Sequence, residues 1–302
     1  MNNLRLLVVG GTGFFGKSII DSFLRGLLKK YRIKWLIISS RSASNFQKQH
    51  PEFVHNNIKF VDLDITNAKS IPESDIIIHA ATSAKQIDYI KDPFYEKENT
   101  ERGIINFIDL IKKLQYKPKI VYCSSGAVYG IQPSNILNIR EDFPFQDIQK
   151  LSLPKKIYCL SKREAEKIIL ESGKENLNVS IARCFAFYGK YLPIDEHFAY
   201  GNFLRDAKKG KDIVVNADHL VFRSYMHSDE LVNSLIKIAF SSNSTCPIYN
   251  VGSDNEISLF DLAKKIAKKY NVKVKMKKNI NYQKIDRYVP NTDKLKTLIS
   301  LN

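Results

Sequence analysis

The sequence predicts an α/β protein in which a doubly wound parallel sheet is followed by a smaller mixed α/β lobe. Three observations predict this fold. Short, almost continuously apolar segments alternate with segments of helical period through residues 1–183, as expected for parallel strands that helices bury on both faces. A glycine turn joins the first of these strands to the first helix. After residue 183 the elements become short and irregular, and they are too few for a second large sheet.

Six strands and three helices are expected in the first part of the chain. The strands are predicted at residues 4–9, 34–39, 58–62, 75–79, 119–124 and 178–183. The helices are predicted at residues 17–29, 95–114 and 158–172, the second of them ending before Pro118. Because the crossovers between parallel strands are right-handed, the helices should cover both faces of one sheet.

The second part of the chain is expected to form loops and short elements. Pro, Gly, Tyr and Phe crowd residues 185–201, which indicates loops over a binding cleft. Short elements are predicted near residues 213–215, 228–240, 248–251 and 258–270. Ser258 and Asp261 form a capping-box pattern at the start of the last of these. We expect this lobe, residues 184–302, to pack over the carboxyl ends of the strands, with residues 228–252 returning to the main domain.

Composition describes a soluble protein without a metal site. Of its 302 residues, 44% are hydrophobic and 26% are charged, and no apolar run reaches the ~20 residues that a membrane span requires. The N-terminus lacks a signal-peptide pattern. Cys123, Cys159, Cys184 and Cys246 show neither a CxxC motif nor metal-ligand spacing. We therefore expect reduced, structural cysteines, a cytoplasmic protein and no association with a membrane.

The net charge of +16 raises the question of nucleic acid. The lysines, however, are scattered along predicted helices and do not alternate with aromatic residues. A lysine-rich solvated surface explains this pattern, so we expect no nucleic-acid partner. A positive field would also favour anionic small-molecule ligands.

The glycine turn predicts a dinucleotide-binding site. Gly10, Gly13 and Gly16 are spaced G-x-x-G-x-x-G between a strand and a helix. Glycines let the backbone approach a pyrophosphate, and the free N–H groups of the helix N-terminus face its negative charge. Residues 1–183 are therefore expected to form a Rossmann domain, and the predicted phosphate contacts are Gly10, Thr12, Gly13, Phe14, Phe15 and Gly16.

Tyr158 and Lys162 form a candidate catalytic pair. Four residues apart on a predicted helix, they share one face. The lysine could lower the pKa of the phenol and hold a nicotinamide ribose, so that the phenol exchanges a proton with a carbonyl or an alcohol. This spacing is common by chance, and a tyrosine packed beside a surface lysine would also produce it. The pair gains weight because Ser124 and Ser125 end the preceding strand, at the carboxyl edge of the sheet.

With these motifs the chain resembles the extended short-chain dehydrogenase/reductases, specifically their nucleotide-sugar epimerase/dehydratase branch. The resemblance covers essentially the whole chain. It rests on the glycine turn, on His79-Ala80-Ala81, on Asn99, on the segment SSGAVYG at residues 124–130, on Tyr158-x-x-x-Lys162 and on Arg223-Ser-Tyr-Met-His.

The resemblance implies a role for each matching residue. Ser125 would hydrogen-bond the reacting sugar oxygen, with Tyr158 as the acid/base and Lys162 as its partner. The matches on the cofactor side are Asp64 and Ile65 at the adenine, Ala80 and Ala81 along the cofactor, and Asn99, which stabilises the site. The matches on the substrate side are Arg223 and Arg287, which would clamp the diphosphate, and Asn202, which would contact it. For these last three residues, a purely structural or surface role remains open.

The end of the second strand bears on the choice of cofactor. NAD-binding relatives carry a carboxylate there for the adenosine ribose, whereas this chain reads Ser39-Ser40-Arg41. Serine and arginine suit a 2′-phosphate, so Ser39 and Arg41 predict NADP(H), with NAD(H) as the alternative.

Two departures from the family pattern bear on the reaction. Similar 4,6-dehydratases have Asp and Glu where this chain has Gly126 and Ala127, and similar 4-epimerases have Asn where this chain has Ala186. The hypothesis is therefore NADPH-dependent reduction, at C4, of a nucleotide-activated 4-keto-6-deoxy sugar for a surface polysaccharide. A nucleotide-sugar 4-epimerase is the alternative, a 4,6-dehydratase is less favoured, and a non-catalytic, dinucleotide-gated binding protein is a remote one.

A homodimer is expected by resemblance. Relatives pair through the helix before the fifth strand and the helix that carries Tyr158. The isoleucines of these two helices are Ile104, Ile105, Ile108, Ile111, Ile168 and Ile169. These residues could equally face their own sheet, and periodicity does not separate the two possibilities.

Overall fold

The computed structural model describes residues 3–82, 86–194, 198–277 and 279–301. Its centre is a seven-stranded parallel sheet with strand order β11-β6-β5-β4-β1-β2-β3. The strands are β1 (Leu4–Val9), β2 (Ile33–Ser40), β3 (Ile58–Asp62), β4 (Ile76–His79), β5 (Lys119–Ser125), β6 (Val179–Cys184) and β11 (Ile248–Val251). The predicted fold class, a Rossmann-like doubly wound sheet, is confirmed.

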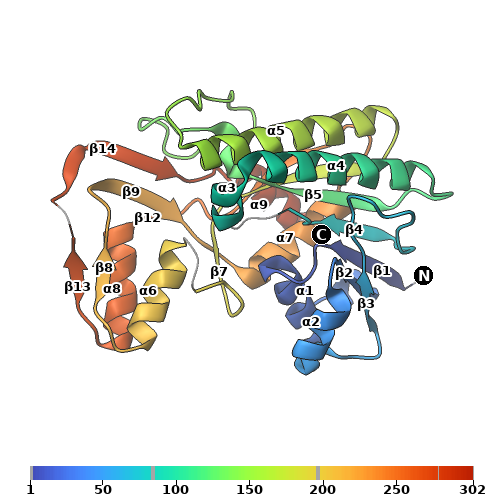
Figure 1. Ribbon diagram of the computed structural model, residues 1–302, viewed down its shortest axis with the longest axis horizontal. Helices are drawn as coiled ribbons and strands as arrows, with labels where there is room; N and C mark the ends of the chain where they lie inside the picture. Colours follow the sequence, from blue (N-terminus) through green and yellow to red (C-terminus); the bar gives the residue numbers. More distant parts are fainter. Residues whose placement is uncertain (1–2, 83–85, 195–197, 278, 302) are drawn as a thin grey trace.

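Helices cover both faces of the sheet, as Figure 1 shows. One face packs against α4 (Pro93–Lys112) and α5 (Leu153–Lys174). The other packs against α1 (Phe14–Leu24), α7 (Ser228–Phe240) and α9 (Asp293–Ser300). The shorter helices are α2 (Ala43–Gln49) and α3 (Gln86–Lys91). The inner strands β1 and β4 to β6 are mostly apolar, and this arrangement buries them except for the first residues of β1 and β5.

The lobe at the left of Figure 1 is built from short elements. They are α6 (Ala199–Lys208), β8 (Ile213–Val215), β9 (His219–Ser224), β12 (Glu256–Ser258), α8 (Leu259–Tyr270), β13 (Val274–Met276) and β14 (Asn281–Tyr288). Strands β12, β9 and β14 form one small sheet, β13 and β8 form another, and β7 (Phe187–Tyr188) pairs with β10 (Met226–His227). The capping box of α8 is present, because the Ser258 hydroxyl accepts a hydrogen bond from the Asp261 N–H at 3.0 Å.

Helix ends differ most from the sequence-based expectations. Helix α1 spans Phe14–Leu24 instead of 17–29, because Gly26, at φ +76°, turns the chain two residues later. Helix α5 begins at Leu153, five residues before the predicted start, with Pro154 in its first turn. Pro is favoured at that position, since its missing N–H would have no helical partner there.

Composition predicts reduced, structural cysteines and no membrane-spanning segment. All four cysteines are free and buried. Within the described ranges, no helix combines the length and the apolar character needed to cross a bilayer.

Candidate functional site

The glycine turn is held tightly between β1 and the neighbouring strands. Gly10, at φ +82°, donates its N–H to the Ser39 carbonyl at 2.8 Å, and Gly11 donates to the same oxygen at 2.9 Å. A Cβ at Gly10 would lie 2.6 Å from the Ala81 Cα, and one at Gly16 would overlap the Gly11 carbonyl. The space around Gly13 is open to 4 Å. The turn therefore leaves room only at the N-terminus of α1, where a phosphate would bind.

Thr12, Phe14 and Phe15 follow this geometry. The three residues are half-buried, and Gly13 caps the first turn of α1. The Phe14 and Phe15 rings pack toward Phe187, with centroid distances of 6.5 and 5.5 Å. Because the two side chains are anchored on β7, their backbone N–H groups stay at the open end of the helix.

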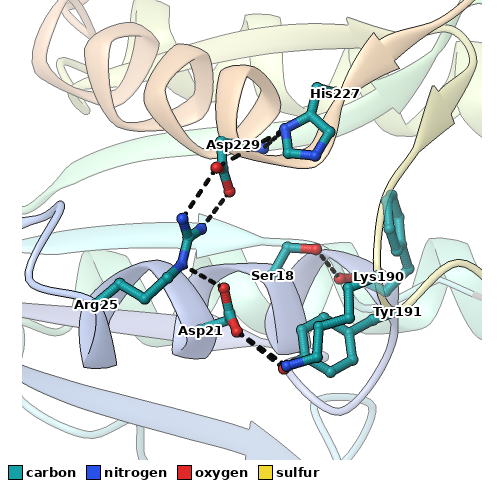
Figure 2. A network of polar contacts seen from close by, with 8 residues as sticks. Ser18, Asp21, Arg25, Lys190, Tyr191, His227 and Asp229 are labelled. Atoms are coloured by element: carbon teal, nitrogen blue, oxygen red, sulfur yellow. Dashed lines mark hydrogen bonds and ion pairs between the residues drawn. The ribbon is translucent and has the colours of Figure 1, made fainter.

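A polar network fixes α1 to two other segments (Figure 2). Asp21 accepts hydrogen bonds from Arg25 Nε at 2.6 Å and from the Tyr191 hydroxyl at 3.0 Å. Arg25 also pairs with Asp229, whose N–H donates to His227 Nδ1 at 3.2 Å. The helix behind the glycine turn is thus bound both to the start of α7 and to the segment that leads into the lobe.

The predicted adenine side is only partly as expected. The Ser39 side chain is buried and donates to the Val8 carbonyl at 3.3 Å, so its hydroxyl points into the sheet and cannot contact a ribose phosphate. Its contribution is the carbonyl that holds Gly10 and Gly11. Arg41, by contrast, is exposed at the carboxyl end of β2. Asp64 accepts hydrogen bonds from the N–H and hydroxyl of Thr66 at 3.0 and 2.9 Å.

Ile65, Ala80 and Ala81 line this side of the site. Ile65 is buried, with its Cγ2 3.4 Å from the position that a Cβ of Gly103 in α4 would occupy. Ala80 follows β4 and donates its N–H to the Val9 carbonyl at 2.8 Å, while Ala81 contacts Gly10. The ends of β1 and β4 and the glycine turn therefore form one continuous surface.

Ser125 and Tyr158 come together at the carboxyl edge of the sheet. Ser125 ends β5, and its hydroxyl accepts a hydrogen bond from the Ala127 N–H at 3.2 Å. Burial raises the pKa of Tyr158, whereas a hydrogen bond with Ser125 acts in the opposite direction. The Tyr158 ring also meets the edge of the Tyr89 ring at 5.2 Å. A hydroxyl donor and a phenol therefore face the same point.

Lys162 lies one helical turn further along α5 and is buried. Its Nζ donates to the Cys123 carbonyl at 3.0 Å and to the Tyr122 hydroxyl at 3.3 Å, and it lies 6.0 Å from the centroid of the Tyr158 ring. Burial lowers its pKa to about 8. The structure thus places the ammonium beneath the Tyr158 ring and directs its hydrogen bonds into the sheet.

Asn99, predicted to stabilise the site, is half-buried on α4. Its side-chain oxygen accepts a hydrogen bond from Arg102, one turn further along α4, at 3.3 Å. The next residue, Thr100, is 8% exposed and interacts with Tyr89. Adjacent helical residues differ by about 100° in direction, so the inward side chain at this level is Thr100.

Two aromatic residues close the space beside Gly126. A Cβ at Gly126 would lie 2.7 Å from both the Phe185 ring and the Tyr288 hydroxyl. The Tyr288 hydroxyl is also 3.5 Å from the Ser125 hydroxyl. Tyr288 belongs to β14, 163 residues away in sequence, and local motifs could not have identified it as a residue of the site.

The two predicted arginine clamps point to opposite faces of the lobe sheet. Arg223 and Tyr288 are cross-strand partners and share a face, whereas Arg287 pairs with Phe222 on the other face. Arg223 forms an ion pair with Asp286 at 2.9 Å, and Arg287 pairs with Glu256. Only Arg223 lies on the side of Ser125, so in this structure the two side chains do not meet. Asn202, on α6, accepts a hydrogen bond from Arg205 at 3.2 Å.

Known proteins are similar to this chain over most of its length. A model of the NAD dependent epimerase/dehydratase family matches residues 6–252. The chain is similar to UDP-glucuronic acid decarboxylase 3 of Arabidopsis thaliana, at 24% identity over 276 residues, covering 91% of this chain and 77% of the relative. It is 27% identical over 267 residues to a putative UDP-glucose 4-epimerase of Methanocaldococcus jannaschii, covering 86% and 81%.

A solved structure supports the same fold. The dTDP-glucose 4,6-dehydratase of Bacillus anthracis, determined in complex with NAD, superimposes with a TM-score of 0.78 at 20% identity. The superposition covers 99% of this chain and 91% of that one.

Proposed function

The chain belongs to the NAD dependent epimerase/dehydratase family, and from this premise we propose that it is an NADPH-dependent nucleotide-sugar reductase. The proposed reaction is reduction, at C4, of a nucleotide-activated 4-keto-6-deoxy sugar that is destined for a surface polysaccharide. The proposed catalytic residues are Ser125, Tyr158 and Lys162.

The observation that carries this proposal is the closed space beside Ser125. Gly126 and Ala127 stand where similar 4,6-dehydratases have an acid and a base, and Phe185 and Tyr288 fill the space that a side chain at 126 would need. An elimination at the sugar requires such groups. What remains is a pair of hydroxyls, which suits the addition of a hydride and a proton to a carbonyl.

The glycine turn fits a nicotinamide dinucleotide, because it leaves open space at Gly13, at the N-terminus of α1, while it packs tightly elsewhere. A bound cofactor would supply the hydride. Tyr158 would donate its phenolic proton to the sugar oxygen, and the Ser125 hydroxyl would hydrogen-bond the same oxygen. The positive charge of Lys162, under the Tyr158 ring, would favour the phenolate that is left.

NADP(H) is the proposed cofactor because Arg41 stands exposed at the end of β2 and no carboxylate occupies residues 39–41. Family membership alone implies NAD, which remains the alternative. The roles of Asp64, Ile65, Ala80 and Ala81 along the cofactor are part of this proposal.

The lobe, mainly residues 184–302, is the proposed site for the nucleotide diphosphate sugar. Arg223 shares a face with Tyr288 and is the proposed diphosphate contact. On binding, its guanidinium would either keep its ion pair with Asp286 or exchange that pair for the diphosphate. Asn202 is the second proposed contact.

The test is incubation with NADPH and a panel of 4-keto nucleotide sugars, following the loss of NADPH absorbance, with Tyr158→Phe as the control. Oxidation that needs both the sugar and Tyr158 is the expected result. The similarity to a UDP-glucuronic acid decarboxylase and a putative UDP-glucose 4-epimerase favours a second candidate, in which the cofactor is recycled within one turnover. UDP-glucose and UDP-glucuronic acid therefore belong in the panel. Product formation from either without NADPH consumption would replace the reductase proposal.

We also propose that the chain works in the cytoplasm as a homodimer formed through α4 and α5. Four of the six isoleucines on these helices are buried against their own sheet (Ile104, Ile108, Ile111 and Ile169). Ile105 is 50% exposed and is the apolar residue best placed for a partner. A monomeric mass by light scattering would contradict the dimer.

A further inference from the structure

The ammonium of Lys162 is held on the sheet side by Tyr122, a residue for which the family motifs provide no role. Tyr122 lies on β5 and is 1% exposed. Its hydroxyl accepts a hydrogen bond from Lys162 Nζ at 3.3 Å, and Nζ lies 5.1 Å from the centroid of its ring. The same hydroxyl interacts with Thr82, just after the Ala80–Ala81 surface. Lys162 Nζ therefore contacts the Tyr122 ring and oxygen, and it also lies 6.0 Å from the centroid of the Tyr158 ring.

The surroundings of Lys162 make this contact important. Its other hydrogen bond goes to a neutral group, the Cys123 carbonyl. The one nearby carboxylate that affects its pKa, Glu166, is engaged by Arg183. The titratable groups that face Lys162 are His79 on β4, Tyr122 and Cys123 on β5, Cys184 on β6, and Tyr158 and Glu166 on α5. A buried ammonium depends on its hydrogen-bond acceptors, because few of its donors can be satisfied by water.

We propose that Tyr122 is a positioning residue for the catalytic site: its hydroxyl fixes the Lys162 ammonium below Tyr158 and keeps it charged. This inference rests on the proposed role of Lys162 in catalysis. It adds a residue from the strand to a pair that the sequence pattern places on one helix.

The contact makes a prediction about pH and stability that needs no ligand. Burial lowers the pKa of Lys162 to about 8 in the folded protein, below its unfolded value. The unfolded chain then binds more protons than the folded chain above about pH 8, so the contribution of Lys162 to stability increases with pH through that range. Burial raises the pKa of Tyr122, so its hydroxyl stays protonated throughout. Removing this acceptor should therefore destabilise the protein at low pH and should matter little once Lys162 is neutral.

The experiment is urea unfolding of Tyr122→Phe and the unchanged protein at about pH 6.5 and about pH 9.5. The expected result is a lower urea midpoint for Tyr122→Phe at the acidic pH, and recovery of most of that loss at the alkaline pH. In a Lys162→Met background the same substitution should produce no pH-dependent loss. Tyr129→Phe is the matched control, since it also removes a buried phenol oxygen, one bonded to Asn250 and Arg183, and should lose stability equally at both pH values.

Equal loss for Tyr122→Phe at both pH values, or no loss at either, overturns the proposal. A second readout is the pH profile of kcat, whose fall on the alkaline side should move down by about one pH unit in Tyr122→Phe. If the unfolding result is as expected but no panel sugar is turned over, the positioning role stands and the proposed reaction fails. The two failures are therefore distinguishable.

Discussion

Arg41 is the residue that most directly tests the choice of cofactor. It is exposed at the carboxyl end of β2, whereas the Ser39 hydroxyl is turned into the sheet. A charged hydrogen bond to a 2′-phosphate is worth about 1.5 kcal/mol, roughly a factor of ten in affinity. Arg41→Ala should therefore weaken NADPH binding about tenfold and leave NADH binding unchanged, as measured by cofactor fluorescence. Lys34→Ala, near the amino end of the same strand, is the control. An equal loss for both cofactors would contradict a phosphate contact.

Gly126 tests the closed space beside Ser125. An alanine there would place its Cβ 2.7 Å from the Phe185 ring and the Tyr288 hydroxyl, and overpacking of this kind costs roughly 1–3 kcal/mol. We expect Gly126→Ala to lower the urea midpoint and the activity together. Combining it with Phe185→Leu should restore part of the stability. A stable and fully active Gly126→Ala variant would mean that this space can open, and the argument against an acid at position 126 would lose its basis.

Single residues show where sequence reasoning succeeds and where it stops. Ser125, Tyr158 and the glycine turn could be located because each motif is contiguous and fixes its own local geometry. Asn99 and Thr100 are adjacent, and only the observed rotation of α4 decides which of them faces inward. Tyr288 reaches Ser125 through the lobe sheet, and the opposite directions of Arg223 and Arg287 depend on the register of β9 and β14. Such long-range contacts have no signature in a single sequence.

At the scale of elements, a buried ion pair joins β5, α5 and β6 directly behind the site. Arg183 on β6 donates to both carboxylate oxygens of Glu166 on α5, and Ser124 on β5 donates to the same carboxylate at 2.6 Å. The two charged side chains are 5% and 3% exposed. Although burial lowers the pKa of Arg183, its interactions with Glu166 raise it overall. The pair therefore persists as a charged link that sets the angle between the helix of Tyr158 and the strand of Ser125.

Glu166→Gln should cost about 3–5 kcal/mol of unfolding free energy, because it leaves the Arg183 charge buried without a counter-charge. Urea unfolding measures this loss. Glu171→Gln on the same helix removes the exposed pair with Lys174 and should cost less than about 1 kcal/mol. Similar losses for the two variants would mean that the buried pair contributes no more than a surface one.

The predictability of elements follows their burial. The six strands predicted in the first part of the chain agree with β1 to β6 to within one residue at each end, since the strands of a helix-covered parallel sheet appear in the sequence as short apolar runs. Helix α5 was shortened in the prediction, because its first turn is polar and contains Pro154. Strands β9 and β14 were missed. The burial pattern of β14 shows why, since its first four residues are exposed and carry no alternation. These two strands are stabilised by pairing with each other, and the local pattern of a sequence does not reveal such pairing.

At the scale of the whole molecule, one stretch of the lobe is strongly positive. The thirty residues from Ile257 to Asp286 contain nine lysines and two acidic residues, within a chain of net charge +16. In α8 these lysines lie opposite the buried Leu262, Ala263 and Ile266, so they face solvent. Such a field attracts a dianionic nucleotide sugar from a distance and is screened by salt within about 10 Å at 0.1 M.

Association with an anionic substrate should therefore depend on ionic strength. We expect kcat/KM for the active nucleotide sugar to fall several-fold between about 20 mM and about 200 mM salt, with kcat nearly constant, because steering changes the rate of encounter and not the chemistry. Lys268→Glu/Lys269→Glu, on the exposed face of α8, should reduce both kcat/KM at low salt and its dependence on salt. Lys112→Glu/Lys113→Glu, at the end of α4, makes the same change of net charge outside the lobe and should have the smaller effect. If the two double variants respond alike, the total charge of the molecule steers the substrate and the distribution of charge over the lobe does not.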